Sequence, residues 1–62
     1  MKFVVFFHNA TKSYQRHVAI FLDAVPAYLE RQHPNAMRAE FCDQQMMLAA
    51  IDVWLSGGDL PF

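Results

Sequence analysis

The chain has 62 residues and a mass of 7.2 kDa, with 55% apolar and 18% charged residues. An apolar fraction this high excludes a disordered chain, and the length allows one domain, residues 1–62. Five lysines and arginines face six acidic residues, for a formal net charge of −1. Because the cations are scattered along the chain, they form a poor footprint for a phosphate backbone, and we expect no direct nucleic-acid binding.

Apolar runs and cysteine content bear on the setting of the protein. The longest apolar runs, residues 3–7, 18–22 and 46–51, fall far short of the roughly 20 residues that cross a bilayer, so we expect no membrane partner. Cys42 is the single cysteine. A lone thiol cannot build the disulfide framework of a small secreted domain, which favours a cytoplasmic protein. We expect Cys42 to be half-buried and structural, because free cysteine packs as a small hydrophobe.

The first predicted element is a strand over residues 2–8. Its core, Phe-Val-Val-Phe-Phe, is β-branched and aromatic and is apolar at every position. A strand that is buried on both faces gives this continuous pattern, so we expect an interior strand with material above and below it. Thr11 or Ser13 in the polar connection that follows could cap a helix.

Residues 13–33 allow two interpretations. Apolar residues recur at steps of three and four from Tyr14 to Leu29, which favours one helix that is kinked at Pro26. In the alternative, residues 18–22 form a strand, and a fresh short helix starts at residues 23–26. We prefer the kinked helix, because the apolar positions keep to one face on both sides of the proline.

The second half of the chain predicts a strand and a helix. His33-Pro34-Asn35 marks a break, and period-two alternation over residues 37–42 predicts a strand with one polar face. Asp43 is a candidate N-cap, and Gly57-Gly58 supplies the helix stop. The helix between them carries an apolar stripe of Met47, Leu48, Ile51, Trp54 and Leu55.

These elements predict a small α+β fold in the order β-α-β-α. A strand, a long helix and a second strand would form a right-handed parallel crossover, which gives a two-stranded sheet that dimerisation could extend. The alternative order is ββαβα, which follows if residues 18–22 are a strand.

The chain is short of stabilising contacts for a protein that acts alone. In a chain of about 60 residues, one hydrophobic core rarely supplies more than a few kcal/mol of stability. No disulfide is available to add to it. Ile20, Met46 and Val53 fall off the main apolar stripes. We therefore predict a homodimer, or obligate pairing with another protein, with Ile20, Met46, Val53 and Trp54 as partner-binding residues. The alternative is a monomer with scattered surface hydrophobes.

No catalytic, cofactor or metal site is indicated by the sequence. His8, His17, His33 and Cys42 are spaced far more widely than the tight ligand pairs of zinc sites. The serines lack a G-x-S-x-G elbow, and Gly57-Gly58 follows a predicted helix instead of leading into one, as a phosphate loop would.

The sequence therefore favours a non-enzymatic protein-interaction module, a homodimeric regulator or inhibitor that occupies the surface of a partner protein. A compact accessory protein of a phage or bacterium fits this size. One alternative is a minimal oligomeric enzyme with a site completed across the subunit interface, using His8 with Cys42 or Asp43. The other is a small nucleic-acid adaptor using Lys12, Arg16 and His17.

Overall fold

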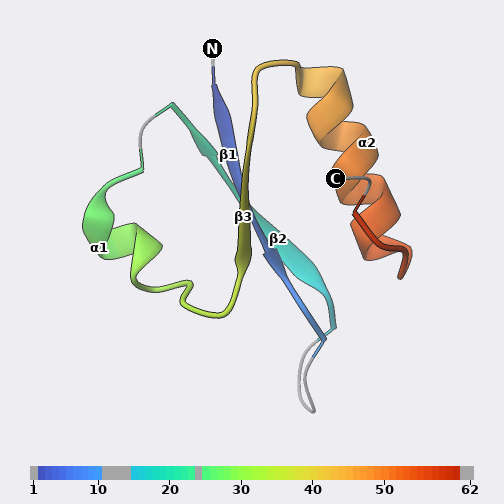
Figure 1. Ribbon diagram of the computed structural model, residues 1–62, viewed down its shortest axis with the longest axis horizontal. Helices are drawn as coiled ribbons and strands as arrows, with labels where there is room; N and C mark the ends of the chain where they lie inside the picture. Colours follow the sequence, from blue (N-terminus) through green and yellow to red (C-terminus); the bar gives the residue numbers. More distant parts are fainter. Residues whose placement is uncertain (1, 11–14, 24, 61–62) are drawn as a thin grey trace.

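The computed structural model describes residues 2–10, 15–23 and 25–60. Their elements follow the order ββαβα (Figure 1). They are β1 (Phe3–His8), β2 (His17–Leu22), α1 (Ala27–Glu30), β3 (Met37–Phe41) and α2 (Gln44–Leu55). The prediction of a small α+β fold is confirmed, and of the two predicted element orders the alternative is correct.

The strand β1 is the centre of a three-stranded antiparallel sheet with the order β2-β1-β3. Val5 pairs with Ile20 on one side and with Ala39 on the other. The interior position predicted for this strand is confirmed, because Val4, Val5, Phe6 and Phe7 are all buried. The predicted two-stranded parallel sheet is wrong, because β2 and β3 both run antiparallel to β1.

Residues 17–22 form a strand where a kinked helix was preferred. Val18, Phe21 and Leu22 satisfy a helical spacing, but residues 18–22 are all apolar and include β-branched and aromatic side chains, which strands favour. Pairing with β1 along its whole length decides between the two. The helix α1 begins immediately after Pro26 and is only four residues long.

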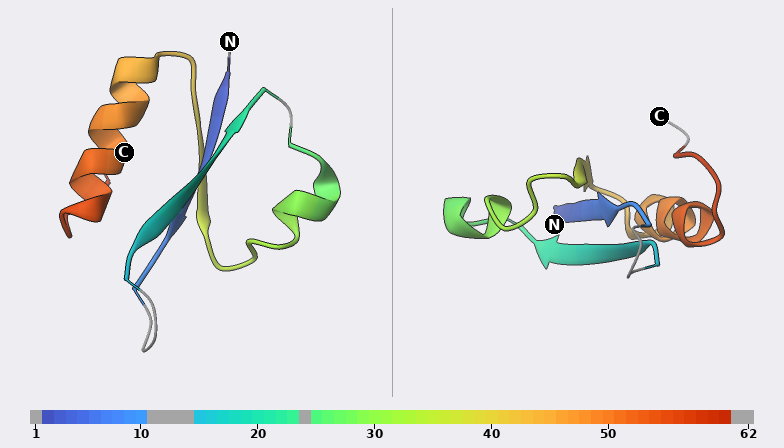
Figure 2. Two further views of the ribbon diagram at one scale, coloured as in Figure 1. Left: turned by 180° about the vertical axis from the view of Figure 1, so that it is seen from behind. Right: turned by 90° about the horizontal axis from the view of Figure 1, so that it is seen from below.

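The two helices lie on opposite faces of the sheet (Figure 1 and Figure 2). In Figure 1 the strands overlap because they are stacked along the line of sight, with α1 on one side and α2 on the other. The right-hand view of Figure 2 shows this stacking directly. The described chain measures 32 × 27 × 15 Å, so the strands succeed one another along the shortest dimension. The two broad sides of the molecule are therefore the two edges of the sheet, β3 on one side and β2 on the other.

The main core lies between the sheet and α2. Val5 and Phe7 project from β1 toward Met47, Ala50, Ile51 and Trp54 of α2. Phe7 and Trp54 meet edge to face, with ring centroids 5.8 Å apart. On the opposite face, Phe6 packs against Phe21 and the ring of His33. Both faces of β1 are thus covered, which explains its uninterrupted apolar sequence.

The ends of α2 follow the sequence prediction. Asp43 is the N-cap, and its Oδ1 accepts hydrogen bonds from the amides of Gln45 and Met46 at 2.8 and 3.3 Å. Gly57 adopts φ 89°, the left-handed conformation that stops a helix at little cost to glycine. Neither helix of the described residues is long and apolar enough to cross a bilayer.

Candidate functional site

The outward edge of β2 offers backbone groups for pairing. The Asp23 amide donates to the Lys2 carbonyl at 2.7 Å, which fixes the hydrogen-bonding phase between β1 and β2. Because this phase alternates along an antiparallel pair, the N–H and C=O groups of Val18, Ile20 and Leu22 point away from β1. The residues from His17 to Leu22 include no lysine, arginine or carboxylate. This edge is therefore an uncharged template for a further strand.

Exposed apolar side chains adjoin this edge. Ile20 and Leu22 are 47% and 57% exposed, although they share a face with the core residue Val5. They remain exposed because the helix contacts of the sheet are concentrated on β1 and β3, which leaves β2 at the border of the α2 layer. The right-hand view of Figure 2 shows α2 level with β1, the middle strand.

The helix α2 contributes to the same side. Leu48 and Leu55 each follow a buried residue, Met47 or Trp54, so they lie about 100° around the helix from the core in one direction. They are 51% and 53% exposed. Met46 precedes Met47 and lies on the opposite flank, beside β3. The flank that carries Leu48 and Leu55 therefore faces the β2 side. We call the edge of β2 together with Ile20, Leu22, Leu48 and Leu55 the β2-side surface.

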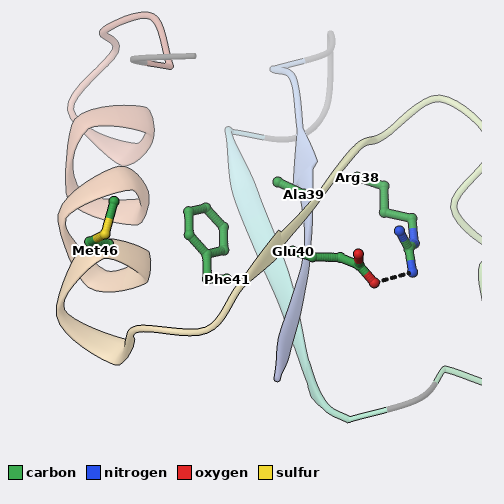
Figure 3. Close-up of a pocket in the computed structure, with 5 residues that line it drawn as sticks. All are labelled: Arg38, Ala39, Glu40, Phe41 and Met46. Carbon is green, nitrogen blue, oxygen red and sulfur yellow. Dashed lines mark hydrogen bonds and ion pairs between the residues drawn. The ribbon is translucent and has the colours of Figure 1, made fainter. Parts of the chain in front are cut away.

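The β3 side has a different character. A hollow of about 400 Å³ crosses the edge of β3 and is lined by Arg38, Ala39, Glu40, Phe41 and Met46 (Figure 3). Figure 3 shows Phe41 and Met46 on the α2 side of β3, with Arg38 and Glu40 projecting on the other side.

Ion pairs follow the β3 edge. Arg38 contacts Glu30 at 2.7 Å and Glu40 at 3.1 Å, and Lys2 contacts Glu40 at 3.3 Å. Hydrogen bonds from Lys2 and Arg38 lower the pKa of the Glu40 carboxyl. An incoming strand would have to remove water from these charges, so this edge is protected in the way natural sheets use.

The three histidines form a cluster on the α1 face of the sheet. His8 and His17 are cross-strand partners, and their rings stack with centroids 4.3 Å apart. His8 Nε2 lies 2.9 Å from His33 Nδ1. The His33 ring stacks in turn on Phe6 at 4.7 Å. Sequence spacing alone did not predict this cluster, because antiparallel pairing and the loop after α1 bring the three residues together.

Burial and neighbouring charges both act on His8 within this cluster. Burial and then the charges of His17 and His33 lower the pKa of His8. Among the described residues, no group of three or more histidines, cysteines or carboxylates is arranged to hold a metal ion. The hollow near Met46 is lined by β3 and α2, so the histidines do not border it. The use of His8 as a catalytic base remains a prediction from the sequence.

The four predicted partner-binding residues do not share one surface. Ile20 lies on the β2 side, whereas Met46 and Val53 lie on the opposite flank of α2, and all three are exposed. Trp54 is 4% exposed and belongs to the core of the monomer. Its indole Nε1 donates to the His8 carbonyl at 3.1 Å. We therefore do not include Trp54 in the candidate surface.

Arg16 and Cys42, two further residues considered from the sequence, lie outside the β2-side surface. The Arg16 guanidinium lies 4.0 Å above the Trp54 ring and donates to the carbonyls of Trp54 and Gly58, at 3.1 and 2.8 Å. This arrangement holds the Arg16 guanidinium against the C-terminal end of α2. Lys12, Thr11 and Ser13 lie outside the described residues. Cys42 is exposed, so the expectation of a half-buried cysteine is wrong, because β3 ends one residue before it.

Leu22, Leu48 and Leu55 are the surface residues that the sequence analysis missed. All three were assigned to buried helical stripes. The signal that could have identified them was the strand interpretation of residues 18–22, which removes the helix that would have covered them.

Comparisons with family models, curated proteins and solved structures found no match to this chain.

Proposed function

We propose that the chain is a small protein-interaction module that binds another polypeptide through the β2-side surface. Such a module would act as a regulator or inhibitor by occupying the surface of its partner. The binding mode is strand addition, in which backbone hydrogen bonds give affinity and flanking apolar side chains give specificity.

The contrast between the two sheet edges supports this proposal. The β3 edge carries Lys2, Arg38 and Glu40 in ion pairs, whereas β2 carries no such charges and borders four half-exposed apolar side chains. A soluble protein that had no use for an open edge would be expected to protect both. Exposed apolar side chains also occur on the β3 side, at Met37, Met46 and Val53, but that edge carries the ion pairs of Arg38 and Glu40. On the β2 side the exposed apolar side chains adjoin an uncharged edge, and contiguous exposed apolar patches mark interaction sites.

Site-specific photocross-linking tests the proposal. A benzophenone amino acid placed at Ile20 or Leu55 in the expressing cell should give a discrete protein adduct, whereas the same group at Tyr28, exposed on α1, should not. Adding Leu48→Asp should suppress the adduct from Ile20 while the circular dichroism spectrum stays unchanged. An adduct pattern that is the same from Ile20, Leu55 and Tyr28, or the absence of any adduct, would contradict the assignment of this surface.

A further inference from the structure

The outward edge of β2 is self-complementary. If a second β2 lies antiparallel with Ile20 opposite Ile20, Val18 of each copy faces Leu22 of the other. All three residues point their backbone groups outward, so each facing pair can exchange two hydrogen bonds. We propose that the occupant of the β2-side surface is a second copy of this chain, paired antiparallel through β2. This inference rests on the proposed function, because it names the partner of the same surface.

Polar side chains at the two ends of β2 support this register. His17 begins the strand, and Asp23 directly follows it. In the antiparallel register centred on Ile20, residue 17 of each copy lies opposite residue 23 of the other. Oδ1 of Asp23 lies 3.4 Å from the Lys2 amide, and Nδ1 of His17 lies 3.2 Å from the Gln15 carbonyl. The second carboxylate oxygen of Asp23 can then accept a hydrogen bond from the other ring nitrogen of His17 at both ends of the interface. A parallel arrangement would instead place each group opposite its own copy.

The position of α2 fits the same arrangement. Antiparallel neighbours in a sheet are related by a twofold axis perpendicular to it, so both α2 helices fall on one face of the joined sheet. The two β1 strands then lie about 14 Å apart, which is three strand spacings. Packed helices approach to about 8–10 Å, and the additional separation leaves room for Leu48 and Leu55 from both copies above Ile20 and Leu22.

This pairing gives a closed dimer. Joining two three-stranded sheets leaves the β3 strands as the outer edges of the assembly. Those edges carry the ion pairs of Arg38 and Glu40, which oppose further strand addition. A twofold interface uses the same patch on both subunits, so association stops at two copies and does not continue into a fibre.

Amide hydrogen exchange measured by NMR tests the second copy as the occupant. Between micromolar and millimolar protein, exchange of the Val18, Ile20 and Leu22 amides should slow at least tenfold. The Arg38 and Glu40 amides, which point outward from β3, should exchange at the same rate at both concentrations. The inference is overturned if the three β2 amides show no concentration dependence or if protection appears at β3 instead.

Matched variants make the test specific. Ile20→Lys should weaken self-association at least tenfold, whereas Met46→Lys, which places the same charge on the β3 flank of α2, should leave it unchanged. Should Ile20→Lys fail to fold, the exchange data on the unaltered chain still decide the matter. If those data show no self-association but position 20 cross-links to a different protein, the second copy is wrong and the proposed function stands. If position 20 yields no adduct at all, both fail.

Discussion

His8 Nε2 lies 2.9 Å from His33 Nδ1, which ties the central strand to the loop that follows α1. One nitrogen must donate and the other accept, so the contact cannot survive when both rings are doubly protonated. Burial and the charges of His17 and His33 already lower the pKa of His8 from its ordinary value of 6.5. The surroundings of His8 therefore favour its neutral form.

This relationship predicts that acid weakens the fold. The unfolded chain takes up the His8 proton at a higher pH than the folded chain, so stability is complete above pH 6.5 and falls as pH drops through the lower folded pKa. Urea unfolding at one protein concentration should show a lower free energy at pH 5.5 than at pH 7.5. His8→Gln should flatten that slope. An unchanged slope in the variant would remove His8 as the cause.

Arg16 is expected to stabilise the end of α2. It donates to the carbonyls of Trp54 and Gly58 and lies above the Trp54 ring. Arg16→Ala should lower the free energy of unfolding by about 2 kcal/mol, since it removes charge-assisted hydrogen bonds and a cation–π contact. Arg31→Ala, at an exposed position, should change it by less than about 0.5 kcal/mol. Equal effects from the two variants in urea unfolding would contradict the role given to Arg16.

Asp43 should contribute through its capping bonds. Asp43→Ala removes the acceptor for the amides of Gln45 and Met46 and should cost about 1 kcal/mol, as N-cap substitutions do. Asp52→Ala is the control, because Asp52 is exposed within α2 and alanine is the better helix former. Asp43→Ala should therefore lower the thermal midpoint, whereas Asp52→Ala should leave it unchanged or raise it. A neutral Asp43→Ala would show that α2 does not depend on this cap.

Trp54 is expected to report on stability and not directly on binding. Trp54→Phe keeps an aromatic ring in the core but loses the Nε1 donor to the His8 carbonyl, and the free energy of unfolding should fall by about 1–2 kcal/mol. Tyr28→Phe, at an exposed residue of α1, should have little effect. If Trp54→Phe is as stable as the unaltered chain in urea, the indole hydrogen bond contributes nothing net.

The sequence was informative where one local pattern had one structural solution. Residues 3–7 are apolar at every position and became the interior strand, and Asp43 and Gly57 bound α2 as predicted. Residues 18–22 were different, since their apolar spacing fits a helix and their composition fits a strand. Cross-strand pairing with β1 decides that choice, and no local signal reports it.

The choice between helix and strand for residues 18–22 also decides which residues form the candidate surface. Treating residues 18–22 as helix made the chain a parallel two-stranded unit and assigned Leu22 to a buried stripe. Once β2 is an edge strand, Leu22, Leu48 and Leu55 become exposed together. Ile20 was singled out because it lay off the stripe of the predicted helix, and in the structure it is exposed on the strand β2. The histidine cluster was not predictable, because its members come from β1, β2 and a loop.

Pairing with a second copy along β2 makes the mass of this protein in solution depend on its concentration. Sedimentation equilibrium on the unaltered protein, over a range from micromolar to millimolar, measures this most directly. The mass should rise from 7.2 kDa to twice that value and then stop, and Ile20→Lys should remain at 7.2 kDa. A mass of 7.2 kDa for the unaltered chain at every concentration would contradict this pairing.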